Sequence, residues 1–397
     1  MDNTLELYYE SAYIKEFDAE VISCQEGNNA KYEVVLDKTA FFPEQGGQTS
    51  DIGCLIDEEQ KEHKVLHTSI SSGEGLIRHI TDSPIAKGTK VHGCIDWEHR
   101  FSNMQQHTGE HIFSGIVHSR YGFENVGFHL SDSEVTMDYS GVLTEEDIRD
   151  IELEVNKAIW ANVEVICEFP DADKLSTIDY RSKKELSGDV RIVTIPGYDV
   201  CACCAPHVLK TGEIGLLKVV GLQNYKGGVR VNILCGGRAL EYVNSQQNIV
   251  KELVSIFTTS EEKIVDSVKK LSDENISSKQ KLAEAMDELV GYELKEIDPS
   301  KEDVFLFKPS TYDGNTMRKM VNALSQAHGG YCGVFAGDDV ENYRYIISTG
   351  ALGKDLKAVQ ELLKNEFAAR GGGNAKMIQG SIEKLNVQEL LNKLEQL

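Results

Sequence analysis

The residue types best suited to chemistry lie in the stretch MQQHTGEHIFSG, residues 104–115. His107 and His111 are four positions apart, and Glu110 directly precedes the second histidine. On a helix, side chains at this spacing project from one face, so the two imidazoles could meet one tetrahedral metal ion. The order H-x-x-E-H is also the signature of the inverted zinc metallopeptidases, in which the glutamate is the general base. The stretch alone therefore indicates a metal but leaves its chemistry open.

A second pair of metal-binding residue types occurs in CACCAPHV, residues 201–208. Cys203 and His207 are again four positions apart, and a thiolate together with an imidazole suits zinc. The two pairs together predict one zinc ion per chain. Cys201 and Cys204 are substitute ligand candidates, and the alternative that needs no metal is a buried, inert cluster of thiols. Nine cysteines in 397 residues are too sparse for a disulfide scaffold.

The elements that must position these residues change character along the chain. Residues 1–95 contain short strands separated by turn-rich segments such as EGNNA and SSGEG, which predicts a small β-barrel or sandwich. Residues 97–120 lack strand alternation and place Met104, His107 and His111 on one face of a helix. Thr144 can cap a further helix whose first turn is acidic. DVRIVTI, LLKVVGL and VRVNILC then read as strands.

The later part of the chain is helical and then mixed. Between Gly237 and Gly291 the sequence contains no glycine and no proline, and apolar positions from Ile264 to Leu289 follow a heptad rhythm. This pattern fits either a helical hairpin packed on its own domain or a coiled coil between two chains. We expect a multidomain α+β protein with a β-barrel domain (1–95), a zinc-binding domain (96–237), a helical linker (238–297) and an α/β domain (298–397).

Charge and hydropathy limit the class of protein. The net charge of −23 argues against bulk nucleic-acid binding, which needs clustered basic residues. The charge is uneven: residues 1–237 carry 21 basic and 39 acidic side chains, whereas residues 301–397 carry 12 of each. The last domain is therefore the region that would repel a polyanion least. No segment approaches 18 uninterrupted apolar residues and the start resembles no signal peptide, so we expect a cytoplasmic protein without a membrane span.

Four motifs resemble one known family. HTGEH and CCAPH, preceded by FFPEQGGQTSDIG at residues 41–53, resemble the editing domain of alanyl-tRNA synthetase, which also occurs in the alanyl-tRNA editing proteins of the AlaX family. RGGGNAKMIQGS, residues 370–381, is similar to the glycine-rich signature of the DHHA1 domain that ends the long AlaX form. The order of motifs matches that long, freestanding form. Since no aminoacylation module precedes them, we expect that the chain does not charge tRNA.

The resemblance implies roles for specific residues. The family's zinc ligands fall on His107, His111, Cys203 and His207. The usual family element C-G-G-T-H is replaced here by Cys-Cys-Ala-Pro-His, which keeps the ligand spacing and changes the residues between. The implied activity is hydrolysis of the ester that joins serine, or glycine, to the 3′ end of alanine tRNA.

Other residues receive candidate roles in substrate recognition. Thr39, Gln48 or His129 could hydrogen-bond the serine hydroxyl, which a site must read in order to spare alanine. Gly46 and Gly47 could let the backbone approach the terminal adenosine, or could simply form a tight turn. Further candidates, for contact with tRNA phosphates, are Arg370 and Lys376; the alternative there is a flexible loop.

Two other functions remain open. One is a zinc-dependent hydrolase of another small ester, amide or peptide, with Glu110 as its base. The other is a non-catalytic tRNA-binding protein whose zinc is structural. The expected partner is mischarged alanine tRNA, and a homodimer through the helical linker and the last domain is one candidate assembly.

Overall fold

The computed structural model describes residues 4–70, 75–182, 189–338, 341–394 and 396–397. They form a mixed α+β protein, which confirms the predicted class. The chain divides into two compact units, Met1–Glu252 and Leu253–Leu397, and each has its own buried apolar clusters. The finer division into four domains stays a prediction.

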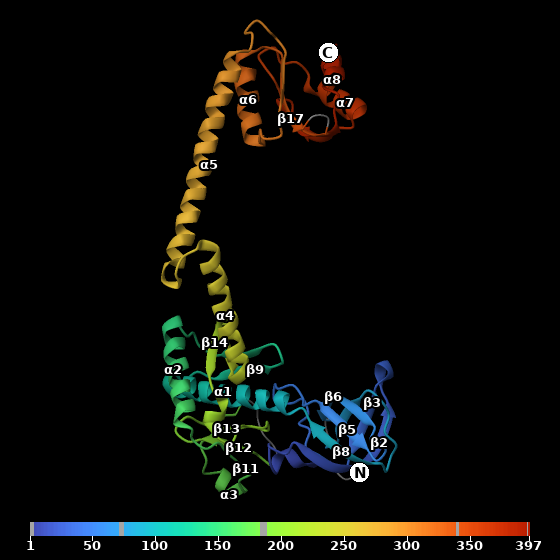
Figure 1. Cartoon of the computed structure of the whole chain (residues 1–397), viewed down its shortest axis with the longest axis vertical. Coiled ribbons are helices and arrows are strands. Elements are labelled where there is room, and N and C mark those ends of the chain that lie inside the picture. The colour runs from blue at the N-terminus through green and yellow to red at the C-terminus, as the bar shows by residue number, and fades with distance from the viewer. Residues whose placement is uncertain (1–3, 71–74, 183–188, 339–340, 395) are drawn as a thin grey trace. The chain divides into compact units, whose positions relative to one another are not determined.

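A closed barrel begins the first unit, as the short strands predict (Figure 1, blue). Its strands follow the order β2-β3-β7-β6-β5-β8, and every neighbouring pair is antiparallel. Their bounds are β2 (Glu16–Glu26), β3 (Tyr32–Leu36), β5 (Gly53–Asp57), β6 (Glu62–Ile70), β7 (Ile77–Thr81) and β8 (Lys90–Ile95). Buried and exposed residues alternate along β2, so Phe17, Ala19 and Val21 fill the barrel interior. Two short strands outside it, β1 (Leu5–Glu6) and β4 (Lys38–Thr39), pair in parallel.

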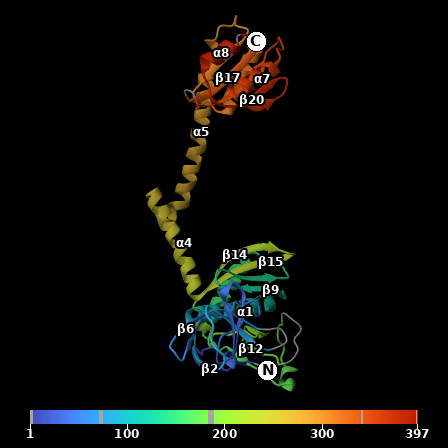
Figure 2. The same cartoon turned by 90° about the vertical axis from the view of Figure 1, so that its right-hand side faces the viewer.

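Helix α1 (Trp97–Tyr121) follows the barrel directly. It begins at Asp96, whose side chain accepts a hydrogen bond from the backbone N–H of His99, and it ends at Gly122 in the left-handed conformation. The side view in Figure 2 shows α1 beside a four-stranded sheet of order β14-β15-β10-β9. These strands are β14 (Leu217–Tyr225), β15 (Gly228–Cys235), β10 (Val135–Tyr139) and β9 (Asn125–Leu130). The helix and this sheet share the largest apolar core, which fixes the buried face of α1.

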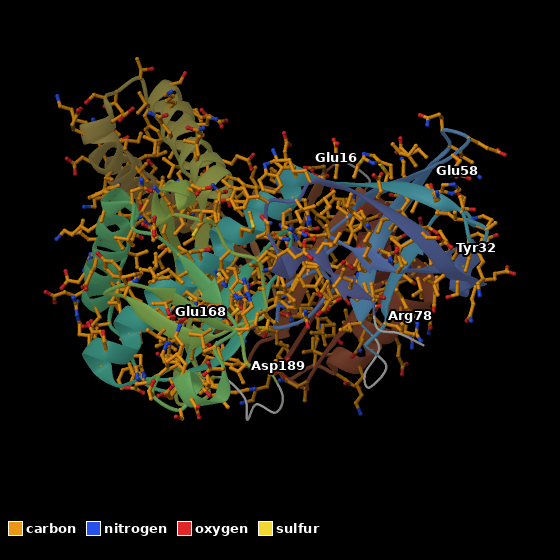
Figure 3. All side chains as sticks on the ribbon, turned by 90° about the horizontal axis from the view of Figure 1, so that it is seen from below. Glu16, Tyr32, Glu58, Arg78, Glu168 and Asp189 are labelled. Atoms are coloured by element: carbon orange, nitrogen blue, oxygen red, sulfur yellow. The ribbon has the colours of Figure 1, made fainter. Side chains whose placement is uncertain are left out.

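A smaller sheet and a second helix complete the region that carries the four predicted metal ligands, the site region. Helix α2 (Glu145–Ala161) has a capping box between Thr144 and Asp147, which confirms the predicted cap. The small sheet contains β11 (Ile166–Glu168), β12 (Ile192–Ile195) and β13 (Asp199–Ala202), with the short helix α3 (Ala172–Leu175) between β11 and β12. Seen from below, Glu168 of β11 lies well away from the barrel residues Tyr32 and Glu58 (Figure 3). The barrel and the site region therefore lie side by side within the first unit.

Helix α4 (Gly236–Phe257) leaves β15, and α5 (Ile264–Lys295) begins after a short turn. The second unit also holds a five-stranded sheet of order β16-β17-β18-β20-β19, in which β16 and β17 are parallel and the other pairs antiparallel. Its strands are β16 (Val304–Lys308), β17 (Tyr331–Asp338), β18 (Glu341–Thr349), β19 (Arg370–Gly373) and β20 (Met377–Lys384). Its other helices are α6 (Gly314–Ala327), α7 (Leu356–Phe367) and α8 (Val387–Leu394).

The heptad stripe predicted for the linker lies on α5 and is largely exposed. Val268, Leu271, Leu282 and Leu289 expose between 43% and 66% of their surface. The buried residues of α5 are Ile264 at its start and Val290 near its end, and Val290 joins the core formed with α6. The coiled coil and the homodimer stay predictions. Among the residues that the structure describes, no helix combines the length and the apolar character needed to span a bilayer.

Candidate metal centre

Helix α1 supplies the first two members of the site. His107 and His111 are almost fully buried on one face of the helix, as their spacing predicts. Glycines on α1 allow close packing around them. A Cβ on Gly115 would lie 2.2 Å from the carbonyl oxygen of Tyr198, and one on Gly109 would lie 2.5 Å from Cys235 Sγ. Because Gly115 has no side chain, α1 can lie directly against the start of β13.

The loop after β13 supplies the other two members. Cys203 Sγ lies 3.4 Å from His107 Nε2 and 3.5 Å from His207 Nε2. The ring of His207 lies against that of His111, with 4.7 Å between the centroids. One potential ligand atom from each of the four residues lies within 4.8 Å of the others. The structure thus brings together the four residues chosen from the sequence, in an arrangement compatible with a metal ion.

Hydrogen bonds orient all three histidine rings. His107 Nδ1 lies 2.7 Å from Gln48 Oε1, His111 Nδ1 lies 2.9 Å from Asp199 Oδ2, and His207 Nδ1 lies 3.1 Å from Thr108 Oγ1. The Thr108 hydroxyl donates to the Met104 carbonyl oxygen, so it accepts from His207. A metal-binding histidine commonly donates its second ring N–H to such an acceptor, which leaves the other nitrogen for the ion. The donor set therefore fits a metal bound through Nε2 of each ring and through the thiolate.

Three residues of the site, Thr108, Asp199 and Arg181, were missed in the sequence. Asp199 is the acceptor for His111, and its carboxylate also accepts from Arg181, with Nε 2.8 Å from Oδ1 and Nη2 3.0 Å from Oδ2. Burial would raise the pKa of Asp199, but the hydrogen bonds from His111 and Arg181 outweigh it and lower that pKa. The one available signal was an aspartate on the strand that leads into the cysteine cluster.

Gln48 is the candidate substrate residue that contacts the site. It is buried, its Oε1 is engaged by His107, and its Nε2 has no hydrogen-bond partner among the described residues. Gly46 and Gly47 have φ values of 65° and 84°, and a Cβ on Gly47 would lie 2.5 Å from the carbonyl oxygen of Phe128. Gly47 is therefore required for this loop to pack on β9, whether or not it also approaches a substrate.

Thr39 and His129 lie elsewhere. The Thr39 hydroxyl is buried inside the barrel, 2.8 Å from His79 Nε2, and it accepts from the backbone N–H of Phe41. His79 Nδ1 donates to the Val34 carbonyl oxygen, so its Nε2 must accept from Thr39. The Thr39 hydroxyl therefore already donates one hydrogen bond and accepts another within the protein. His129 is exposed on β9, and strand alternation places it on the face opposite Phe128, whose ring packs against His107.

The remaining candidates near the cysteines have separate positions. Cys201 is buried and, with His111 and Asp199, forms a second group of potential metal ligands that shares His111 with the first. Burial raises the pKa of the Cys201 thiol to about 11. Cys204 Sγ lies 3.4 Å from the position of a Cβ on Gly46. Glu110 is fully buried, and its Oε1 accepts from Ser114 Oγ at 2.7 Å and from Asn125 Nδ2 at 2.6 Å.

In the second unit, the glycine-rich motif borders a cavity of about 670 Å³. Gly371, Gly372 and Gly373 line one side, and the side chains of Arg318 and Arg344 line another. The two basic residues named from the sequence are not among its lining residues. Arg370 is exposed and lies 3.2 Å from Glu383, and Lys376 lies in the exposed turn before β20.

Two family models match parts of the chain that contribute residues to the site. Residues 3–99 match the family model for class II (A) tRNA synthetases, and residues 190–232 match the second additional domain of threonyl and alanyl tRNA synthetases. The first match includes Gln48, and the second includes Cys203 and His207.

Complete relatives extend the match along the chain. An alanine–tRNA ligase of Ignicoccus hospitalis is 31% identical over 98% of this chain and 43% of the ligase. The alanyl-tRNA editing protein AlaX-L of Pyrococcus horikoshii is 33% identical over 60% of this chain and 59% of that protein. The alanyl-tRNA editing protein Aarsd1 of Bos taurus is 29% identical over 66% of this chain and 61% of that protein. The chain thus spans less than two thirds of the length of each of these relatives.

These matches define a class of protein related to the alanyl-tRNA synthetases. Within that class, the resemblance to the alanyl-tRNA editing proteins of the AlaX family is confirmed.

Proposed function

We propose that this protein is a zinc-dependent hydrolase that removes serine, and glycine, from mischarged alanine tRNA. The observation that carries the proposal is the group of four potential ligands, three buried histidines and the half-buried Cys203, in which each imidazole is oriented by a hydrogen bond at Nδ1. The named activity of the relatives AlaX-L and Aarsd1 supports it. One zinc ion per chain would be held by His107, His111, Cys203 and His207. When bound, zinc supplies Lewis acidity and lowers the pKa of a bound water.

Gln48 is the residue that we assign to recognition of the amino acid. Its Oε1 is held by His107, which fixes the orientation of the amide and leaves the Nε2 group as a donor. A donor held in this way can bind the serine hydroxyl, and alanine offers no such partner. The same bond orients the His107 ring, so Gln48 links substrate recognition to the metal ligand.

The second unit is proposed to hold the tRNA body. The cavity beside Gly371–Gly373 presents two arginine side chains, Arg318 and Arg344, and no acidic residue is among its lining residues. Guanidinium groups suit phosphate oxygens, which dominate affinity for nucleic acids. Residues 1–237 are strongly acidic and residues 301–397 are neutral, so the second unit is the more favourable place for a polyanion.

The exposed stripe on α5 and the proposed substrate also support an assembly and a location. The exposed apolar stripe on α5 supports a homodimer in which two such helices cover each other. A charged tRNA as substrate supports a cytoplasmic location.

The decisive experiment is hydrolysis of Ser-, Gly- and Ala-charged alanine tRNA by the full-length protein, with and without a chelator. We expect release of serine and glycine, little release of alanine, and loss of activity with the chelator. His107→Ala should lose both bound zinc and activity. His118→Ala is the matched control, because His118 lies on the same helix, is partly exposed and pairs with Glu124. Equal hydrolysis of all three substrates, or full activity in His107→Ala, would overturn the proposal.

A further inference from the structure

Two aromatic side chains form a small surface beside the cysteine loop. Tyr9 ends the short 3-10 helix Leu7–Tyr9, and Phe169 directly follows β11. Their ring centroids are 5.2 Å apart and their planes meet at 85°. Phe169 exposes 49% of its surface. The neighbouring Glu168 is labelled in Figure 3 and lies on the part of the unit away from the barrel. The partly exposed ring of Phe169 therefore packs edge-to-face with the ring of Tyr9.

This surface is connected to the metal centre by direct packing. Tyr9 belongs to the same apolar cluster as Cys203 and Cys204, together with the buried residue Ala205. Cys204 in turn lies against Gly46 of the glycine-rich loop. Tyr9, which contacts Phe169, and the proposed zinc ligand Cys203 are thus within one packed cluster.

Arg191 contacts both the cysteine loop and the Tyr9 ring. Its Nη1 donates to the carbonyl oxygens of Cys203, at 3.0 Å, and Ala205, at 2.8 Å. Its guanidinium also lies 5.5 Å from the centroid of the Tyr9 ring, within the range of a cation–π contact. Because Arg191 is 9% exposed, this connection is shielded from water. A ligand on the aromatic surface would therefore have a defined position relative to the metal centre.

The charged and aromatic groups around Tyr9 and Phe169 indicate which kind of ligand would bind there. The Tyr8 hydroxyl donates to the carboxylate of Glu6, which stands beside the same cluster. The guanidinium of Arg191, the nearby cation, already donates to the carbonyl oxygens of Cys203 and Ala205, and the carboxylate of Glu6 opposes a phosphate group. The exposed aromatic ring of Phe169 therefore favours a flat, neutral ligand. Nucleobases stack on aromatic side chains regardless of sequence. In an aminoacyl-tRNA the terminal base is separated from the reacting ester by a single ribose, so it must bind close to the metal centre.

We propose that the exposed face of Phe169, supported by Tyr9 and Arg191, is a stacking subsite for the terminal nucleobase of the aminoacyl-tRNA. This subsite rests on the proposed function, since it names where part of that substrate binds. It uses no residue of the metal group, so it can be removed without removing the ion.

The test uses adenosine that carries serine in a stable amide linkage at its 3′ position. Its binding to the full-length protein is measured by titration calorimetry. Loss of one base stack by alanine substitution weakens binding by roughly 5- to 150-fold. We expect a loss in that range for Phe169→Ala and near-complete recovery for Phe169→Trp. Trp160→Ala is the matched control, because Trp160 is 65% exposed on α2, and it should bind as the wild type does.

A second probe isolates the base. The same seryl amide on a ribose without a base should bind the wild type and Phe169→Ala equally. In hydrolysis of Ser-charged tRNA, Phe169→Ala should raise KM with less effect on kcat, while zinc content stays unchanged. Equal binding of the complete analogue by the wild type and Phe169→Ala would overturn the subsite, as would equal losses for both probes.

The outcomes separate this inference from the proposed function. A wild-type protein that binds the analogue through Phe169 and hydrolyses no charged tRNA would retain the subsite and reject the hydrolase. A protein that hydrolyses Ser-charged tRNA with the same KM in wild type and Phe169→Ala would retain the hydrolase and reject the subsite.

Discussion

Asp199 accepts a hydrogen bond from Nδ1 of His111 at 2.9 Å, although the two residues are 88 positions apart in the chain. The carboxylate is buried and is held from its other side by Arg181. This pairing occupies Nδ1 of His111 and leaves Nε2 for a metal ion shared with Cys203 and His207. An acidic residue that orients a metal-binding histidine in this way contributes to metal affinity without touching the ion.

Replacement of Asp199 should therefore weaken metal binding. We expect Asp199→Ala to lower zinc affinity roughly 10- to 100-fold, because the His111 ring loses its orienting acceptor. Competition with a chromophoric chelator measures the affinity. Asp132→Ala is the matched control, because Asp132 also pairs with a histidine of α1, His99, and its side chain is 76% exposed. Unchanged affinity in Asp199→Ala would show that Asp199 only neutralises Arg181.

Glu110 distinguishes an editing site from a peptidase. Its Oε1 accepts from Ser114 and Asn125, and a glutamine at this position can keep both bonds. We therefore expect Glu110→Gln to fold normally and to retain much of the deacylation rate. A general base would lose its function on this change, typically a factor of 10² to 10⁴ in rate. Rates on Ser-charged tRNA and on a peptide library decide between them. Peptide cleavage that Glu110→Gln abolishes would favour the peptidase.

We expect the first unit to carry out hydrolysis and the second unit to bind the tRNA. Every proposed metal ligand precedes Gly237, and the first compact unit ends at Glu252. A protein truncated at Glu252 should keep its zinc and some turnover. Its loss should appear as a raised KM with kcat less affected, because an acidic unit binds a polyanion poorly. Steady-state deacylation at several salt concentrations measures this. An unchanged KM, or loss of kcat with zinc still bound, would assign the second unit another role.

The buried pair of Thr39 and His79 predicts a pH dependence of stability. Burial lowers the pKa of His79 to about 4, although the hydrogen bond to Val34 opposes the shift. The unfolded chain binds this proton near pH 6.5, so the contribution is complete above that pH. It is lost as the pH falls from about 6.5 to 4, and it amounts to roughly 3 kcal/mol.

Unfolding by denaturant in the presence of a chelator measures this dependence without a contribution from the metal. His79→Gln should show a shallower decline in the free energy of unfolding between pH 6.5 and 4. His92→Gln is the matched control, because His92 is exposed and its bond to Asp18 raises its pKa, so the decline should remain. An equal decline in wild type and His79→Gln would contradict the assignment.

Local rules explain what the sequence determined by itself. The pair His107 and His111 needs only helical spacing, and the cap at Thr144 needs only the first turn of α2. The short barrel strands follow from alternation between turns. Each of these patterns spans a few neighbouring residues, because backbone geometry alone decides which side chains share a face or a cap. The helix that carries His107 and His111, the cap of α2, the short barrel strands and the metal-binding residue types were therefore readable from the chain.

Tertiary structure decided which long-range partners these residues meet. Asp199 reaches His111 because Gly115 allows α1 to lie against β13. Thr39 pairs with His79 inside the barrel, and strand register turns His129 outward while Gln48 meets His107. Hydrogen bonds act over about 3 Å, so such pairs depend on how distant elements pack. No local pattern carries that information, and only the packed chain could select Gln48 and Asp199 from the polar residues available.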